Sequence, residues 1–310
     1  FAVTGPGANS NVGTIINNAG DFNHDGYDDI LLSVPSADAL QRGSAGIVFV
    51  LFGSPHMSLS NIELGAFVTG ELGFQIIGAT AMSKLGNAAR GAGDVNGDGI
   101  DDIIVGAKNL NSNAGAVYVL YGHTTDSGSF HDIDLLGFIT GTAGFCLYGA
   151  HPGDFFGVQL AGIGDINDDG LSDIAISASR ADFLGRVDAG IVYVIYGATA
   201  RSADQNMTNF TNGPSTGFKV YGPSTNAGPE TALSAAGDVN GDGIADWIIG
   251  VPGTAVALVA QTGSAYILHG KRNQSANIDL ITFPCCTEGF MMRISTANQN
   301  LGKSVSGAGD

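Results

Sequence analysis

The chain repeats one acidic nonapeptide four times at nearly constant spacing. Each copy follows the pattern Asp-x-Asn-x-Asp-Gly-x-x-Asp, and the copies occupy residues 21–29, 94–102, 165–173 and 238–246. Their first Asp residues are 73, 71 and 73 residues apart, and Asp310 stands where a fifth copy would begin. A period this regular indicates that one structural unit is repeated along the chain.

Each unit also contains four short segments of strand-like composition. β-branched and aromatic residues dominate these segments, and Gly, Asn, Asp or Ser bounds them. In the second unit we expect strands at 85–93, 102–107, 116–121 and 144–149. Four antiparallel strands per unit predict an all-β fold, a β-propeller of four-stranded blades. A solenoid is the alternative, but its repeats are usually shorter, about 20–45 residues.

The phase of the repeat predicts a single propeller domain over residues 1–310. The expected units are approximately 1–73, 74–144, 145–217 and 218–289, followed by a partial unit at 290–310. Residues 1–5 would form the outer strand of a preceding blade, and residues 301–309 the inner strand of a following one. Because proteins normally cover exposed strand edges, we expect four complete blades of a longer propeller.

Composition agrees with a β fold rich in turns. Gly accounts for 48 of 310 residues, about twice the usual ~7%. Of the 29 acidic residues 25 are Asp, which is a poor helix former, so a helical bundle is excluded as the main architecture. The formal net charge of −17 disfavours a nucleic acid as partner, because the phosphate backbone would be repelled. No apolar run approaches the ~20 residues of a membrane span.

The repeated nonapeptide gathers oxygen ligands around one point. Side chains at positions 1, 3, 5 and 9 and the backbone carbonyl at position 7 supply five oxygens, and Gly at position 6 allows the sharp turn. Such a set suits Ca²⁺, which takes 6–8 oxygen ligands. The candidate ligands are Asp21, Asn23, Asp25, Tyr27 and Asp29; Asp94, Asn96, Asp98, Ile100 and Asp102; Asp165, Asn167, Asp169, Leu171 and Asp173; and Asp238, Asn240, Asp242, Ile244 and Asp246.

Charge favours four Ca²⁺ sites. Each loop brings three carboxylates together, which repel one another unless a cation is present. Four Ca²⁺ ions would add eight positive charges and move the net charge from −17 to −9. Mg²⁺ prefers a tighter octahedron, and no thiol or imidazole recurs that would suit Zn²⁺. An EF-hand needs a bidentate Glu at position 12, where this chain has Leu32, Val105, Ile176 and Ile249. We therefore expect calcium to act as a structural pin.

The segment from Gly91 to Ala107, Gly-Ala-Gly-Asp-Val-Asn-Gly-Asp-Gly-Ile-Asp-Asp-Ile-Ile-Val-Gly-Ala, resembles an FG-GAP repeat. Such repeats build the propeller of integrin α subunits and of many surface or secreted proteins. The resemblance implies a seven-bladed fold with Ca²⁺ loops on its lower face, and a role in adhesion or ligand recognition. The Phe-Gly pair is clear at Phe156-Gly157, whereas the fourth unit lacks the Gly, and Asn stands at position 3 throughout.

Blade geometry divides the connections between two faces. We expect the Asp-rich loops to share one face with the long segments 54–72, 123–143, 198–216 and 271–288. The opposite face would carry the turns 36–45, 108–114, 179–189 and 252–262. There a protein or glycan ligand would bind, with Phe183 and Arg186 as candidate contacts, because aromatic and Arg residues dominate binding hot spots.

The sequence does not indicate an enzyme. Its six His residues occupy no common phase of the repeat. The string Gly213-Pro-Ser-Thr-Gly217 matches a nucleophile elbow, but a strand-like segment follows where an elbow requires a helix. FG-GAP-like propellers accompany catalytic domains in some proteins. The alternative is therefore a non-catalytic propeller appended to a secreted hydrolase or lyase domain outside this chain.

Other features fit an extracellular or cell-surface location. Asn206, Asn209 and Asn273 begin glycosylation acceptor patterns. Cys146 lies in an apolar stretch, and Cys285 and Cys286 are adjacent, so the three cysteines give no even disulfide framework.

Overall fold

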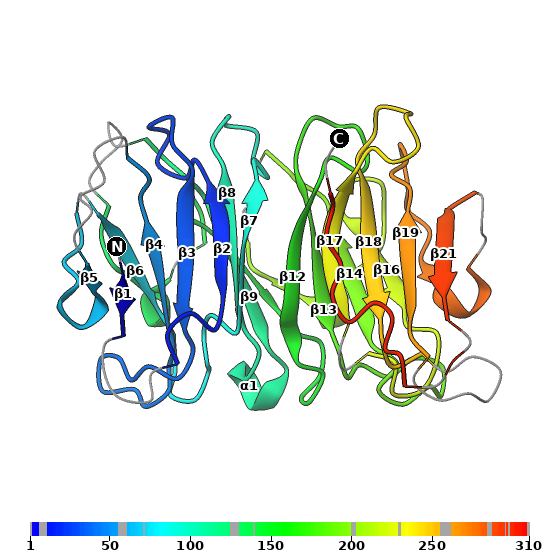
Figure 1. Cartoon of the computed structure of the whole chain (residues 1–310), viewed down its shortest axis with the longest axis horizontal. Helices are drawn as coiled ribbons and strands as arrows, with labels where there is room; N and C mark the ends of the chain where they lie inside the picture. The colour runs from blue at the N-terminus through cyan, green and yellow to red at the C-terminus, as the bar shows by residue number, and fades with distance from the viewer. Residues whose placement is uncertain are drawn as a thin grey trace.

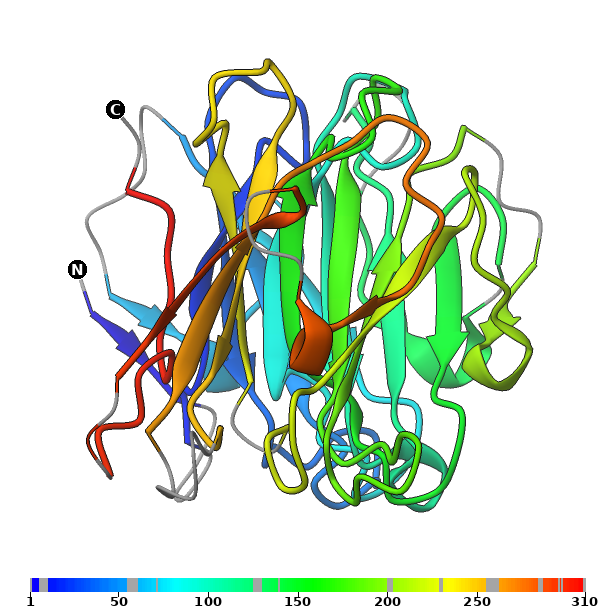
Figure 2. The same ribbon diagram turned by 90° about the vertical axis from the view of Figure 1, so that its right-hand side faces the viewer.

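The computed structural model describes residues 2–5, 11–54, 61–70, 72–124, 130–138, 140–199, 203–228, 231–254, 262–283, 287–294, 296 and 298–308. Within these ranges the chain forms four antiparallel sheets, or blades, side by side around a common axis (Figures 1 and 2). From the innermost strand outward the blades are β2 (Ile16–Gly20), β3 (Asp29–Val34), β4 (Ile47–Leu51) and β6 (Gly73–Ile77); β7 (Ala88–Gly93), β8 (Asp102–Ala107), β9 (Ala116–Leu120) and β11 (Gly144–Tyr148); β12 (Phe156–Gly164), β13 (Asp173–Ala178), β14 (Ile191–Ile195) and β16 (Gly217–Tyr221); and β17 (Ala232–Gly237), β18 (Asp246–Val251), β19 (Ser264–Leu268) and β21 (Gly289–Arg293).

A fifth, parallel strand joins each of the first three blades from the following unit. These strands are β10 (Ile133–Asp134) on β6, β15 (Gln205–Asn206) on β11 and β20 (Ile278–Asp279) on β16. The pair of β1 (Val3–Thr4) with β5 (Ile62–Glu63) has the same parallel form. A 3₁₀ helix follows β5, β10, β15 and β20 directly: η1 (Leu64–Ala66), η3 (Leu135–Gly137), η4 (Met207–Asn209) and η5 (Leu280–Thr282). A helical turn, α1 (Leu110–Asn113), lies between β8 and β9.

The expected all-β propeller blades are confirmed. In the second blade the observed strands differ from the expected ranges by at most three residues at either end. The parallel fifth strand is absent from the sequence-based prediction. It has only two residues and comes from the neighbouring unit, so it offers no alternation of apolar and polar residues to recognise. A total of seven blades and the unit boundaries remain predictions.

Hydrophobic cores lie between neighbouring blades. The first joins Leu31, Val50 and Phe74 of one blade to Ile103 and Tyr118 of the next. Similar clusters pack the second blade against the third, and the third against the fourth. Because both faces of the second and third sheets are covered, β9 and β14 are buried at every position. This explains why these strands read as continuous apolar runs.

Small residues form the innermost strands. β7 reads Ala-Ala-Arg-Gly-Ala-Gly, and β17 reads Ala-Leu-Ser-Ala-Ala-Gly. They allow close approach near the axis, since a Cβ atom on Gly162 would lie 2.7 Å from the carbonyl oxygen of Gly91. The segment before the C-terminus runs beside β17 (Figure 1), and Leu301 forms a parallel bridge with Gly263. All four innermost strands therefore face one axis.

Candidate metal centres

The four nonapeptides occupy equivalent places in the fold. Each connects the innermost strand of a blade to the second strand, and its ninth residue is the first residue of that second strand. We name them loop 1 (21–29), loop 2 (94–102), loop 3 (165–173) and loop 4 (238–246). Because the connection is the same in every blade, the loops lie at the same end of the four sheets.

The first Asp of each loop accepts hydrogen bonds from the backbone of the same loop. In loop 1, Asp21 Oδ1 accepts from the N–H of Asp25 and Asp21 Oδ2 from the N–H of Gly26, both at 2.9 Å. The same two bonds recur in loops 2, 3 and 4. The sixth residue has a φ angle of 91° in loop 1 and 84–88° in the others, a conformation that favours Gly.

In each loop the Asn side chain at position 3 forms hydrogen bonds with the Asp at position 5. In loop 3, Asn167 Oδ1 accepts from the Asp169 N–H at 3.0 Å, and Asn167 Nδ2 donates to Asp169 Oδ2 at 2.9 Å. The other loops contain the same pair of bonds. An amide at this position therefore holds the fifth-position carboxylate.

The ninth Asp is fully buried in every loop. Asp29, Asp102, Asp173 and Asp246 each have 0% exposure. One carboxylate oxygen of Asp102 accepts from the Val95 N–H of its own loop and the other from the Gly122 N–H after β9, both at 2.9 Å. Equivalent bonds hold the ninth Asp of the other three loops. Each ninth Asp thus joins its loop to the end of the third strand.

Burial raises the pKa of these ninth-position carboxyl groups. The pKa is raised to about 7 for Asp29 and Asp102 and to about 8 for Asp173, and it is also raised for Asp246. After desolvation, the carboxylates of the same loop are a further cause of the increase. In contrast, the N–H of Gly243 is the main cause that lowers the pKa of exposed Asp238. A bound cation would relieve this repulsion.

The donor set fits Ca²⁺, although the side chains are not gathered for it. Among the described residues, no three Asp, Glu, His or Cys side chains lie close enough together to hold a metal ion as they stand. In each loop the fifth carboxylate is instead bonded to the Asn amide. Each oxygen of a ninth Asp accepts one N–H and keeps a second lone pair. Coordination would therefore require the Asn amide to turn away from the fifth carboxylate.

The structure gives Phe183 and Arg186 an intramolecular role. The Phe183 ring stacks on Tyr221 with centroids 3.5 Å apart, and the Arg186 guanidinium lies 5.1 Å from the Phe183 centroid. Arg186 also pairs with Asp279, and its side chain is only 14% exposed. Phe183 and Arg186 are thus half-buried and engaged within the chain, and their contact with a ligand stays a prediction. The exposed apolar residues of this loop are Leu184, at 83%, and Val187, at 53%.

The long segments do not stay on the face of the Asp-rich loops, contrary to expectation. Asp134, within 123–143, forms an ion pair with Arg42 of the opposite-face turn 36–45 at 2.7 Å. The reason is the fifth strand, since Ile133 and Asp134 pair with Ile76 and Ile77 at the far end of β6. The middle of such a segment therefore lies along the outer edge of the preceding blade.

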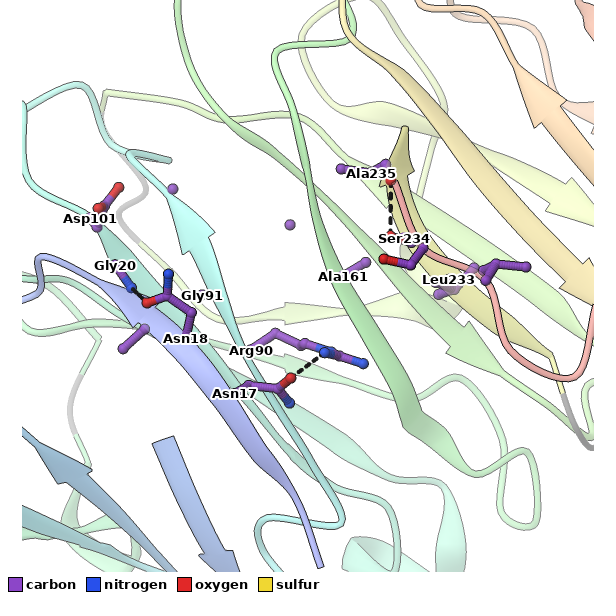
Figure 3. Close-up of a pocket in the computed structure, with 15 residues that line it drawn as sticks. Asn17, Asn18, Gly20, Arg90, Gly91, Asp101, Ala161, Leu233, Ser234 and Ala235 are labelled. Carbon is purple, nitrogen blue, oxygen red and sulfur yellow. Dashed lines mark hydrogen bonds between the residues drawn. The ribbon is translucent and has the colours of Figure 1, made fainter. Parts of the chain in front are cut away.

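The described residues line cavities large enough to admit a small ligand, of which we consider two. One, of about 360 Å³, lies on the axis between β2, β7, β12 and β17 (Figure 3). There Arg90 donates a hydrogen bond to Asn17 Oδ1, and desolvation lowers the Arg90 pKa. The other, of about 580 Å³, is a groove whose lining includes Asp154, Arg180 and Lys219. Val187 also lines it, so this groove adjoins the exposed loop of the opposite face.

The string that matches a nucleophile elbow lies in a turn before a strand. Gly213 and Gly217 form a tight turn that leads into β16, so no helix follows Ser215. None of the helices in the described ranges has the length and apolar character needed to cross a bilayer. Cys146 is a buried free thiol, whereas Cys285 and Cys286 lie outside the described residues.

Comparison with known proteins agrees with this architecture. The FG-GAP repeat family matches residues 2–51, 88–120 and 156–195. The chain is 24% identical over 299 residues to integrin alpha-5 of Xenopus laevis, covering 93% of this chain and 24% of the relative. It is 26% identical over 303 residues to integrin alpha pat-2 of Caenorhabditis briggsae, covering 94% and 22%.

A third relative is named as an enzyme and not as an integrin. The chain is 31% identical over 141 residues to the phosphatidylinositol-glycan-specific phospholipase D of Bos taurus, covering 43% of this chain and 16% of the relative. The chain thus spans less than a quarter of the length of each of these three relatives. Together with the four radial blades, the matches show a β-propeller that contains FG-GAP repeats in three segments and is similar to integrin alpha subunits over most of its length.

Proposed function

We propose that loops 1 to 4 each bind one Ca²⁺ ion, which stabilises the propeller. The observation that carries this proposal is the fourfold recurrence of one hydrogen-bonded arrangement around the same oxygen donors. The ligands would be the oxygen side chains at positions 1, 3, 5 and 9 and the carbonyl at position 7. A single acidic turn can serve its own backbone, but four identical turns in phase point to a common ligand.

The ion would act as a structural pin. The ninth Asp already links its loop to the end of the third strand, as Asp102 does through Val95 and Gly122. An ion on that carboxylate would hold the second and third strands and the loop together. It would also offset the repulsion between the carboxylates of the loop.

We further propose that this propeller is an extracellular recognition module for a protein or glycan. Extracellular calcium modules have Kd values on the order of 10⁻⁴–10⁻³ M, so such sites fill outside a cell and empty inside it. Asn209 and Asn273 are exposed, as sugar attachment requires, and Asn206 is exposed although its side chain caps η4. The likeness to integrin alpha subunits supports the same role.

The ligand would bind on the face opposite the Asp-rich loops. The groove of about 580 Å³ and the exposed Leu184 and Val187 support this choice. Phe183 and Arg186 would then shape the binding loop from beneath. Leu184→Ser with Val187→Ser should remove binding to immobilised matrix proteins or glycans without lowering the melting temperature. Unchanged binding to every member of such a panel would exclude this surface.

The alternative is a non-catalytic propeller that accompanies a hydrolase domain. The similarity to a phospholipase D favours this possibility. Sequencing the full reading frame distinguishes the two roles, because the alternative requires a catalytic domain elsewhere in it. In both cases we expect the present chain to show no turnover.

Thermal unfolding tests the calcium proposal. We expect the melting temperature to rise when millimolar Ca²⁺ replaces a chelator, and to rise less with Mg²⁺, which prefers a stricter octahedron. Equal melting temperatures in Ca²⁺ and in chelator would contradict the structural role.

A further inference from the structure

A continuous series of hydrogen bonds, between backbone groups and to the ninth Asp side chains, connects the four loops. In each of loops 1 to 3, one residue donates its N–H to the ninth Asp of the loop and accepts, on its carbonyl, an N–H from the next blade. The residues that do both are Phe22, Val95 and Ile166, at position 2 of loops 1, 2 and 3. All three side chains are at most 5% exposed.

The junction between loops 1 and 2 shows the arrangement. The Phe22 N–H donates to Asp29 Oδ2 at 3.1 Å, and the Phe22 carbonyl accepts from the His123 N–H at 3.1 Å. His123 follows Gly122, whose N–H donates to Asp102 Oδ1 at 2.9 Å. Gly122 and His123, which are adjacent in the second blade, therefore contact Asp102 and loop 1 respectively.

The next two junctions repeat these bonds. Between loops 2 and 3, the Ala198 N–H donates to the Val95 carbonyl at 2.9 Å, and the Gly197 N–H donates to Asp173 at 2.8 Å. Between loops 3 and 4, the Lys271 N–H donates to the Ile166 carbonyl at 2.7 Å, and the Gly270 N–H donates to Asp246 at 2.8 Å. The series thus runs from Asp29 to Asp246.

Further contacts leave little freedom at these junctions. Asp101, at position 8 of loop 2, accepts the Asp21 N–H of loop 1 at 2.9 Å, and Figure 3 shows Asp101 beside Gly20. In later blades the position-8 N–H groups of Ser172 and Ala245 donate to the carbonyls of Asp94 and Asp165. Loops 1, 2 and 3 are therefore each held by two separate contacts with the next blade, one of them from the next loop.

We propose that the four loops bind Ca²⁺ cooperatively, each bound ion raising the affinity of the adjacent loops. This inference rests on the proposed calcium binding. An ion that immobilises one ninth Asp also orders the position-2 residue bonded to it. That residue holds the next blade in place, so the adjacent loop loses less conformational entropy when it binds its own ion. Such coupling is reciprocal between neighbours and decreases with each junction.

Nuclear magnetic resonance can follow each loop separately during a Ca²⁺ titration. The amide groups of Gly26, Gly99, Gly170 and Gly243 each donate to the first Asp of their own loop and therefore report on it. Asp169→Asn replaces a charged ligand of loop 3 with a neutral one. We expect it to raise the Ca²⁺ midpoint at Gly243 about fivefold or more, and the corresponding change in loop 1, Asp25→Asn, to raise it less.

Asp168→Asn is the matched control. It makes the same charge change at the neighbouring residue, which is not a proposed ligand but pairs with Arg272 beside the junction, so it should raise the Gly243 midpoint less than Asp169→Asn does. If the midpoints of Asp169→Asn and Asp168→Asn agree at Gly243, the coupling is wrong although calcium binding stands. If none of the four glycine amides responds to Ca²⁺ in the unaltered chain, the calcium proposal itself fails.

Removing one hydrogen bond of the series tests the route. In Ala198→Pro, which lacks the N–H to Val95, Asp98→Asn should affect the Gly170 midpoint less than it does in the unaltered chain, because only the contact of Ser172 with Asp94 remains. Asp169→Asn should still affect Gly243. An undiminished effect at Gly170 would contradict the route. Amide hydrogen exchange gives a test without proline. At saturating Ca²⁺, Asp169→Asn should accelerate exchange at Ala198 and Lys271 relative to Asp168→Asn, and equal rates would contradict the proposal.

Discussion

The guanidinium of Arg186 donates hydrogen bonds to both carboxylate oxygens of Asp279, at 2.8 and 2.7 Å. It also donates to the Gly222 carbonyl at 2.8 Å, so one side chain connects a turn of the third blade to the cap of η5. Arg42 and Asp134 make a related contact in the first blade. These pairs fasten the long segment of one unit to the preceding blade.

Loss of the Arg186 pair should destabilise the propeller. We expect Arg186→Ala to lower the free energy of unfolding by about 1–3 kcal/mol, because hydrogen bonds to a charged group are removed and Asp279 loses its partner. Arg186→Lys should recover only part of this loss, since Lys cannot bond both oxygens in the same planar geometry. Urea unfolding measures both variants. A change below 0.5 kcal/mol in Arg186→Ala, roughly that of an ordinary surface substitution, would show that the contact adds little.

The close approach at Gly122 should forbid a larger side chain. A Cβ atom there would lie 2.6 Å from Ile100 Cγ2 and 2.7 Å from the Phe22 carbonyl oxygen, and it would also contact the Asp101 carbonyl oxygen. We expect Gly122→Ala to reduce the free energy of unfolding by about 1–3 kcal/mol, as overpacking does. Gly137→Ala is the control, because nothing lies within 4 Å of its Cβ position. Equal stability of the two variants in urea would contradict the tight junction.

The raised pKa values predict an unusual pH dependence for the metal-free protein. The folded-state pKa of Asp173, about 8, exceeds its ordinary value of 3.8. The folded protein therefore binds more protons than the unfolded chain between about pH 4 and pH 8, and its free energy of unfolding falls as pH rises through this window.

Calcium should counteract this fall. Because Ca²⁺ binds the deprotonated carboxylates, the stabilisation that it provides grows over the same window. Urea unfolding at several pH values, with Ca²⁺ and with chelator, measures both trends. Stability that rises with pH in chelator would contradict the raised pKa values of the ninth-position carboxyl groups.

Substitution within one loop should remove one ion. Asp242→Asn in loop 4 should reduce bound Ca²⁺ by one ion per chain, since it exchanges a charged ligand for a neutral one. Asp28→Asn, at position 8 of loop 1, makes the same charge change outside the proposed ligand set and should leave the number of ions unaltered. Atomic emission after equilibrium dialysis counts the ions. Equal counts in the two variants would remove Asp242 from the ligand set.

Sequence alone predicted the repeating fold because each unit carries its own strand and turn signals. The nonapeptide predicted the turns correctly, since its Asp and Gly residues act on backbone groups within five residues, as Asp21 does with Gly26. Contacts between units were not predictable in this way. Asp134 pairs with Arg42, 92 residues earlier, and nothing in either local sequence marks the partner.

The same distinction applies to single residues. Phe183 was predicted as a ligand contact from its residue type and its Arg neighbour, and nothing nearby in the sequence marks the ring of Tyr221 in β16, on which it stacks. The hydrogen bonds between successive loops were also missed. They use backbone groups of residues such as Ala198, whose side chains carry no signal. Contacts that depend on how blades pack become visible only in the folded molecule.

Direct counting of bound calcium tests the central claim most simply. Isothermal titration of the chelator-treated chain with Ca²⁺ at neutral pH, with atomic emission on the dialysed product, gives the number of ions per molecule. We expect four Ca²⁺ ions per chain, all of which are released when chelator is added. A chain that binds no Ca²⁺ under these conditions while its four blades remain folded would contradict this claim.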